Sequence, residues 1–305
     1  MNEFKKNRYK SVLFGFFTFA IPISIGYPVC HYLLGYDMLA SVMIASMFAT
    51  HTLVAYPIAS RLGIVKNEAV AITVGGTIIT DTAVLLILAV ITGSKQGGLD
   101  QAFWIRLLIS LTIFSAIVFY ILPPVARWFF RNIEGEKTSQ YIFVLALVFL
   151  SAFLAELAGV EPIIGAFMSG LALNSLIPHT SPLMNRIEFV GNALFIPFFL
   201  ISVGMLVDVK VLSNGPWALI VAATLSVVAI SGKWAAAWIT QRVFRYSRYQ
   251  RNVIWGLSNA HAAATLAVIL VGYNIGILDE NVLNGTIILI LITCLVASFV
   301  TEGAG

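Results

Sequence analysis

Short polar turns divide the sequence into a series of apolar segments, and each segment is about as long as a helix that crosses a bilayer. The composition agrees with this pattern, because 10% of the 305 residues are charged and 59% are hydrophobic. Soluble domains contain roughly 25% charged residues. The sequence therefore predicts an all-α membrane protein with about ten transmembrane helices, organised as a single transmembrane domain without a soluble domain. The predicted spans are 11–34, 38–60, 67–92, 103–126, 139–159, 161–175, 191–209, 215–243, 250–275 and 281–301.

Basic residues predict the orientation of these helices, since Lys and Arg concentrate at the cytoplasmic face of a membrane. With the N-terminus in the cytoplasm, fourteen of the 18 Lys and Arg fall at cytoplasmic ends. Lys95, Arg106 and Lys210 fall on the other side, and Lys233 lies inside a span. We therefore expect both termini to be cytoplasmic. The net charge of +4 reflects this asymmetry and contact with anionic lipid, and it does not indicate a nucleic-acid partner.

Asp81 is a carboxylate close to the middle of the 67–92 segment, with apolar residues on both sides. A charge at that depth costs at least about 2 kcal/mol on insertion scales, so an intramembrane acid marks a functional site with a partner. The structural alternative is a protonated Asp that is hydrogen-bonded between helices. Glu156, Glu161 and Asp208 lie near span ends, where water reaches them, and are expected to be hydrated helix termini.

Lys233 is the second ionisable residue at depth, about two-thirds of the way along the 215–243 segment. Roughly two helical turns separate it from the end of the segment, which is too far for its side chain to reach the interface. We expect it to point into the helix bundle. Cys30 and Cys294 both lie inside apolar segments, so they are expected to be packing residues, with no disulfide or metal cluster.

Two segments contain polar interruptions of the kind found in transporter helices. The 38–60 segment carries Ala-Thr-His-Thr at 49–52 and the 250–275 segment carries Ser-Asn-Ala-His at 258–261. Irregular backbone at this depth survives where it lines a cavity or is buried in protein, and paired interruptions indicate a substrate site. Alternatively, the hydroxyls bond to their own helices and the histidines pack between helices. Two histidines without a neighbouring carboxylate or cysteine make a poor metal site.

The interruptions also suggest an internal repeat. An interrupted segment followed by one further segment occurs at 38–60 and 67–92, and again at 250–275 and 281–301. An inverted repeat of about five helices would need two further helices before Met1. We therefore expect an N-terminally shortened form of a twelve-helix architecture.

Four stretches together carry a resemblance to a known family. They are GTIITDTAVLLIL around Asp81, AELAGVEPIIGAFMSGLALN at 155–174, PFFLISVGMLVDVKVL at 197–212 and SGKWAAAW at 231–238. In this order they resemble monovalent cation:proton antiporters of the sodium/proton and potassium-efflux type, across essentially the whole chain. The resemblance implies an inverted-repeat fold in which two broken helices cross. It also implies a location in a bacterial inner membrane and a homodimer in the full-length protein.

The resemblance further implies a division into a moving core and a scaffold that forms the dimer. The core would comprise 38–92 and 191–275, and the scaffold 11–34, 103–126 and 161–175. The ion-binding aspartate of the family falls on Asp81 and its core lysine on Lys233. Its crossing helices fall on the interruptions at Thr50 to Thr52 and Ser258 to His261.

The function implied is exchange of Na⁺ or K⁺ for protons, without a cofactor and without enzymatic chemistry. A desolvated carboxylate can be neutralised by a proton or by a cation but not by both at once, so competition for Asp81 gives exchange. Electrogenic members have two adjacent acids where this chain has Thr80 and Asp81, so the exchange is expected to be electroneutral. The expected ion-binding residues are Asp81, Thr80, Thr50, Thr52, Ser258 and Asn259, with Lys233, His51 and His261 as charge-compensating residues.

A sodium-coupled symporter of an organic anion is the alternative, since it shares crossing broken helices. An intramembrane aspartyl protease would need a second central acid, and the sequence has none. The Ser-Asn-Ala-His stretch lacks the glycine-rich turn of a serine nucleophile. A channel would need a pore loop or rings of acids, and neither is present. The choice between Na⁺ and K⁺ depends on cavity geometry, which the sequence leaves open.

Overall fold

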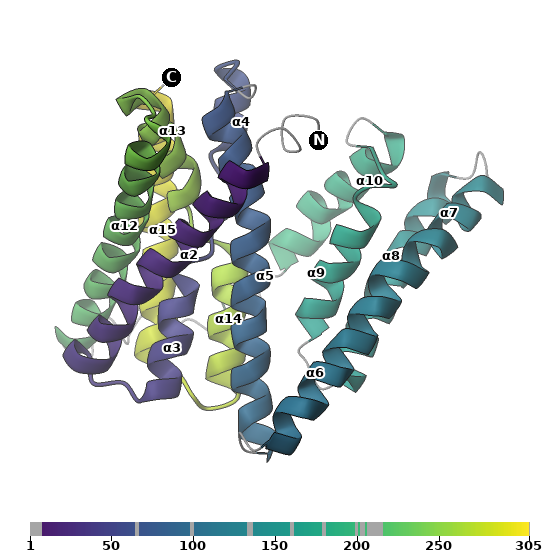
Figure 1. Cartoon of the computed structure of the whole chain (residues 1–305), viewed down its shortest axis with the longest axis horizontal. Helices are drawn as coiled ribbons and strands as arrows, with labels where there is room; N and C mark the ends of the chain where they lie inside the picture. Colours follow the sequence, from purple (N-terminus) through teal and green to yellow (C-terminus); the bar gives the residue numbers. More distant parts are fainter. Residues whose placement is uncertain are drawn as a thin grey trace. The chain divides into compact units, whose positions relative to one another are not determined.

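The computed structural model describes residues 8–64, 67–97, 101–132, 137–158, 162–178, 181–198, 201, 205 and 216–304. The described part of the chain is helical and contains no strand (Figure 1). Seven of its helices are long and apolar enough to cross a membrane, which confirms an all-α membrane protein. They are Arg8–Leu33, Glu68–Lys95, Leu108–Asn132, Thr138–Leu157, Trp217–Phe244, Arg248–Asn274 and Glu280–Gly303.

The remaining three predicted spans take other forms. The 38–60 segment splits into α3 (Met38–Met47) and α4 (Tyr56–Arg61), and 161–175 contains the short apolar helix α9 (Pro162–Leu173). The 191–209 segment begins with the π-helical turn η3 (Gly191–Phe195), and most of its remaining residues lie outside the described part of the chain. The prediction that these segments cross the membrane stays a prediction.

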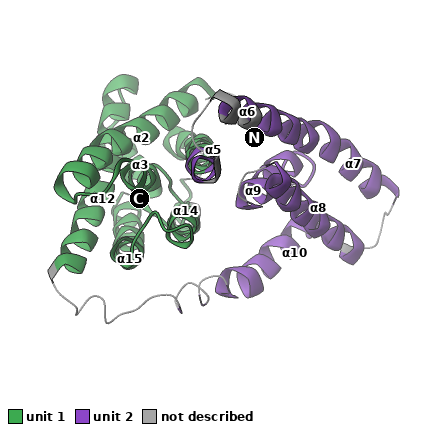
Figure 2. Ribbon diagram, turned by 90° about the horizontal axis from the view of Figure 1, so that it is seen from below, with its two compact units in different colours: residues 1–88, 207–305 green, residues 89–206 purple. Residues whose placement is uncertain are grey.

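The chain divides into two compact units, coloured green and purple in Figure 2. Unit 1 comprises residues 1–88 and 207–305 and contains both predicted interruptions. Besides α3 and α4, its helices are α2 (Arg8–Pro28) with the π-helical turn η1 (Val29–Leu33), the first part of α5 (Glu68–Gly97), α12 (Pro216–Phe244), α13 (Arg248–Asn259), α14 (Ala263–Asn274) and α15 (Glu280–Gly303). The sequence grouped 11–34 with the scaffold, whereas α2 packs in unit 1 against α3 and α12.

Unit 2 comprises residues 89–206. It contains the end of α5, together with α9, η3, α6 (Gln101–Ala116), η2 (Ile117–Ile121), α7 (Leu122–Asn132), α8 (Lys137–Leu157) and α10 (Pro182–Val190). Helices α8 and α9 pack very closely, because a Cβ at Gly165 would overlap the carbonyl of Ser151. Glycine at this position therefore sets the distance between the two helices.

The helix interruptions are visible in unit 1 as two stretches without helical backbone. The first break, residues 48–55, separates α3 from α4, and the second break, residues 260–262, separates α13 from α14. Pro57 lies in the first turn of α4, where its missing N–H is tolerated. In the second break, Ala260 is extended and Ala262 has φ −154° and ψ −122°, so neither continues a helix.

Helix starts far from the breaks carry side-chain caps. Asp37 caps α3, Asp279 caps α15, and Ser247 forms a capping box with Gln250 at the start of α13. At the second break, by contrast, α14 begins at Ala263, and its N-cap residue Ala262 provides no side-chain cap. Its first N–H groups and their positive partial charge therefore lie next to the break.

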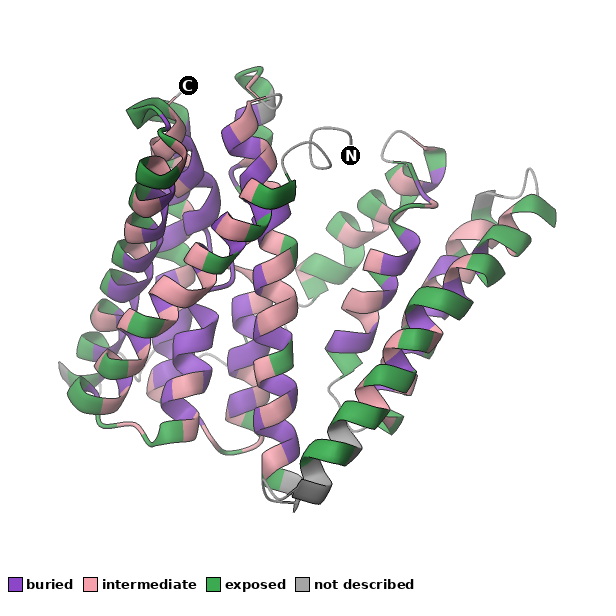
Figure 3. Cartoon of the chain, in the orientation of Figure 1, coloured by how far each residue is buried: buried purple, intermediate pink, exposed green. Residues whose placement is uncertain are grey.

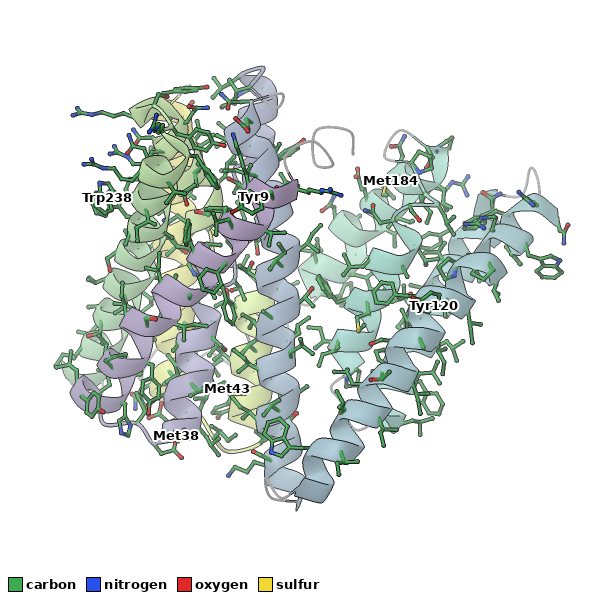
Figure 4. All side chains as sticks on the ribbon, in the orientation of Figure 1. Tyr9, Met38, Met43, Tyr120, Met184 and Trp238 are labelled. Carbon is green, nitrogen blue, oxygen red and sulfur yellow. The ribbon has the colours of Figure 1, made fainter. Side chains whose placement is uncertain are left out.

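Close packing places both breaks in the most enclosed part of unit 1. Among the seven described spans, Arg248–Asn274 has the largest buried share and Leu108–Asn132, in unit 2, the smallest. Buried residues gather on α3 and α13 (Figure 3). Met43 of α3 lies against α14, where its sulfur would overlap a Cβ at Gly272 (Figure 4). Residues 48–51 of the first break and 260–261 of the second are thus buried in protein.

Two ion pairs show that the start of α2 and the end of α15 lie at the same end of unit 1. Lys10 of α2 pairs with Glu68 at the start of α5 at 2.6 Å. Arg61 at the end of α4 pairs with Glu302 of α15 at 3.4 Å. Because Arg61 and Glu68 are close in the sequence, both pairs lie at one end of the unit. The prediction that both termini are cytoplasmic stays a prediction.

Candidate ion-binding site

The two breaks meet. The backbone N–H of Thr52 donates to the carbonyl of Ala260 at 2.8 Å, a hydrogen bond between the two interrupted stretches. The hydroxyls of Thr50 and Thr265 are 2.7 Å apart, which joins the first break to the first turn of α14. Backbone groups that the breaks release from helical bonding are therefore partly satisfied by each other.

Lys233 is fully buried in α12 and points at the end of α3. Its Nζ donates to the carbonyl of Ala49 at 2.6 Å and to the hydroxyl of Thr18 at 3.0 Å. The ammonium thus binds a carbonyl freed where α3 ends, at the negative end of the helix dipole. Lys233 thus points into the helix bundle, as expected from the sequence, and a half-helix terminus supplies one of its hydrogen bonds.

His51 lies in the first break and is fully buried. Its Nε2 is 2.8 Å from the hydroxyl of Thr77 in α5, and its Nδ1 is 3.5 Å from Nζ of Lys233. The ring of Phe14 contacts it edge to face at 6.4 Å between centroids. The imidazole therefore links α12 and α5 through the first break.

Asp81 lies near the middle of α5 and belongs to unit 1. Its Oδ1 atom is buried and has no hydrogen-bond partner among the described residues. The carboxylate interacts with the backbone amide of His51 and with the charge of Lys233. Neither of the two ion pairs in the described part of the chain includes it. An unpaired carboxylate oxygen in a buried position is costly unless a proton or a cation neutralises it.

The second break presents neutral oxygen atoms. Oγ of Ser258 and Oδ1 of Asn259 are buried and have no hydrogen-bond partner within the part of the chain that is described. The amide Nδ2 of Asn259 donates to the carbonyl of Thr293 at 3.4 Å. Both residues are in the last turn of α13, where carbonyl groups also carry negative partial charge. Oxygen ligands of this kind suit a hard cation.

His261 is fully buried in the second break and makes contacts of a packing histidine. Its Nδ1 is 2.9 Å from the carbonyl of Asn259 and its Nε2 is 3.4 Å from the carbonyl of Phe48. Cys294 donates to the carbonyl of His261 at 3.3 Å. No group of three or more potential metal ligands occurs among the residues described.

The threonines predicted as ion ligands differ in what their oxygen atoms do. The hydroxyl of Thr80 donates to its own helix, at 3.0 Å to the carbonyl of Thr77 and 3.3 Å to that of Gly76. Thr50 likewise donates to the carbonyl of Met47 at 2.7 Å while it contacts Thr265. For these two hydroxyls the structure matches the alternative of bonding to nearby backbone. Thr52 contributes its backbone N–H to the crossing.

Sequence reasoning missed three hydroxyls of the site. Thr18 and Thr77 bind Lys233 and His51, and Thr265 binds Thr50. Thr77 could have been found, because it lies four residues before Asp81 and so shares its face of α5. Thr18 and Thr265 carry no comparable signal, since single threonines in apolar helices usually bond to their own backbone.

An all-helical membrane protein whose two interrupted helices meet around a buried acid and a buried lysine has the architecture of a secondary transporter. Residues 1–303 match the family of sodium/hydrogen exchangers, transmembrane part. The chain therefore belongs to this family, as its motifs predicted.

Individual relatives point the same way. The chain is 38% identical over 310 residues to Na(+)/H(+) antiporter NhaS5 of Synechocystis sp., covering 99% of this chain and 44% of the relative. It is 25% identical over 307 residues to probable Na(+)/H(+) antiporter 3 of Methanocaldococcus jannaschii, covering 99% and 78%. It is 26% identical over 319 residues to K(+)/H(+) antiporter 1 of Saccharomyces cerevisiae, covering 98% and 36%. The chain thus spans less than half of the first and third relatives, and none of the three names is that of an organic-anion symporter.

Proposed function

We propose that this chain is the transport part of an antiporter that exchanges a monovalent cation, Na⁺ or K⁺, for protons. The observation that carries the proposal is the buried, unpartnered Oδ1 of Asp81 beside the crossing of two helix breaks. The names of the three relatives support cation and proton as the two substrates.

Exchange follows from competition at one carboxylate. A proton or a cation removes the charge of Asp81, and the empty, charged form is disfavoured in a desolvated surrounding. Ser258 and Asn259 offer the unpartnered oxygens that a cation needs in addition. Thr80 supplies no second titrating group and its hydroxyl is bound to its own helix, which supports an electroneutral exchange.

Unit 1 is the proposed ion-carrying core, because it contains both breaks, Asp81 and Lys233. This assignment moves 11–34 from the scaffold to the core. Unit 2, which includes 103–126 and 161–175, is the proposed scaffold and contributes to a homodimer in the full-length protein. The basic residues support an orientation with both termini in the cytoplasm, and the resemblance to the family supports a bacterial inner membrane.

The deciding experiment replaces Asp81 by Asn in proteoliposomes that contain a pH-sensitive dye. We expect wild-type vesicles to release protons on addition of Na⁺ or K⁺, with Li⁺ as a third test ion, and Asp81→Asn to abolish the release. Asp279→Asn is the matched control, because Asp279 caps α15 away from the breaks and Asn caps a helix equally well. Normal exchange in Asp81→Asn would refute the proposal.

A further inference from the structure

His51 differs from an ordinary buried histidine because polar groups of two helices, α12 and α5, converge on it. Its ring contacts Lys233 of α12 on one side and Thr77 of α5 on the other. Its backbone amide interacts with the carboxylate of Asp81. One residue of the first break therefore interacts with both charged groups of the site, which have no direct hydrogen bond to each other in the part of the chain described.

The hydrogen bonds around the ring favour one position for its proton. The Thr77 hydroxyl donates to the carbonyl of Thr73 at 3.1 Å, so its oxygen is free to accept Nε2–H from His51 at 2.8 Å. A neutral imidazole has one N–H, and Nδ1 is then the bare nitrogen. This bare nitrogen faces the Nζ atom of Lys233 at 3.5 Å, where it can accept a hydrogen bond from an ammonium.

Few other ionisable groups surround His51. Among the described residues, those facing it are Lys233 from α12, Asp81 from α5 and His261 from the second break. Helix α2 contributes Phe14, which does not titrate. Of these groups, the ammonium of Lys233 lies 3.5 Å from a ring nitrogen.

We infer that His51 is a positioning residue. Through its ring, the charged form of Lys233 influences the orientation of α5. The ammonium stabilises the tautomer in which Nδ1 is unprotonated and Nε2 carries the proton. In this tautomer Nε2–H donates to the hydroxyl oxygen of Thr77, which lies one helical turn before Asp81. The ring keeps its proton throughout, so no proton passes through it. The role of the contact between Lys233 and His51 in transport rests on the proposed function, whereas the tautomer of the His51 ring does not depend on it.

The first test compares two substitutions that each preserve half of the ring's contacts. In His51→Asn the amide oxygen can occupy the Nδ1 position and accept from Lys233, whereas in His51→Gln the amide reaches the Nε2 position and keeps the contact with Thr77. We expect His51→Asn to retain the pH profile of cation-dependent proton release. His51→Gln should move its alkaline limb by about one pH unit to lower pH, because the ammonium loses an acceptor.

A role in packing alone predicts the reverse order, since Gln matches the length of the ring better than Asn. A wild-type profile in His51→Gln, or a larger shift in His51→Asn than in His51→Gln, would overturn the inference. His31→Gln is the control, because His31 lies in η1 and its ring contacts the backbone carbonyl of Tyr36 rather than the breaks. Its profile should equal that of the wild type.

The second test does not depend on transport. Nitrogen-15 NMR of imidazole-labelled protein in detergent distinguishes a bare ring nitrogen from a protonated one, and the His51 signals are those missing in His51→Asn. We expect bare Nδ1 and protonated Nε2, and the opposite assignment would overturn the inference. Absence of cation-dependent proton release from wild-type vesicles, together with bare Nδ1, would refute the proposed function and leave the contact between Lys233 and His51 intact.

Discussion

The two helix breaks meet in one place but are stabilised in different ways. At the first break the protein supplies its own cation, since the Lys233 ammonium binds the carbonyl of Ala49. At the second break no charged side chain takes this role among the described residues, and the oxygens of Ser258 and Asn259 stay unpartnered. Both breaks expose the negative end of a half-helix. The comparison shows that one negative end is compensated by a buried ammonium, whereas the second matches the proposed place for an exchangeable cation.

The largest effect should come from removing the built-in cation. Lys233→Met should reduce exchange at least tenfold and lower the free energy of unfolding by about 2 kcal/mol, because the carbonyl of Ala49 and the hydroxyl of Thr18 lose their buried partner. The loss is limited because the cost of burying an ammonium disappears as well. Thermal unfolding in detergent and dye-based transport measure the two effects. Unchanged stability and exchange would mean that the first break needs no compensation.

A smaller effect is expected at the second break. Ser258→Ala removes a buried hydroxyl that has no partner in the described structure, so the free energy of unfolding should stay equal or rise by up to about 1 kcal/mol. The cation concentration for half-maximal exchange should rise roughly fivefold, because one ligand oxygen is lost, worth about 1 kcal/mol. Titration of proton release with Na⁺ and K⁺ measures this half-maximal concentration. A clear loss of stability with unchanged cation affinity would contradict the proposal that the second break supplies ligands to the exchangeable cation.

The smallest effect concerns the contact that joins the breaks. Thr50→Val and Thr265→Val should each cost about 1 kcal/mol of unfolding free energy, because each removes the hydrogen bond between the two hydroxyls. The double variant should cost less than the sum of the two, with a coupling of about 0.5 kcal/mol or more. Additive losses in thermal unfolding would show that the two hydroxyls act separately. Glu302→Gln is the control, because its exposed ion pair with Arg61 contributes little.

Hydropathy and interruptions predicted much of this arrangement from the sequence. Seven predicted spans are helices of the expected length, and both interruptions fall where helical backbone ends. Asp81 and Lys233 stand out in the sequence because charge is rare at such depth. Both residues lie in the same compact unit as the two interruptions, which is where paired interruptions predict a substrate site.

The partners of these groups could not be predicted in the same way. A carbonyl becomes free for Lys233 only because α3 ends before Ala49, and sequence patterns place helix ends to within a few residues at best. Whether a threonine hydroxyl binds its own helix, as at Thr80, or another residue, as at Thr265, depends on side-chain packing. The grouping of α2 with the breaks is also a tertiary property, because its apolar sequence resembles that of the other spans.

Enclosure of Lys233 in the same unit as Asp81 has an electrical consequence. If this unit moves as one body, its ammonium travels together with whatever occupies the carboxylate. The proton-loaded and the cation-loaded forms then carry the same net charge. The electrical work of moving one form inward is therefore cancelled by the work of moving the other outward. A complete cycle would therefore draw no power from the membrane voltage, and ion gradients alone would set its direction.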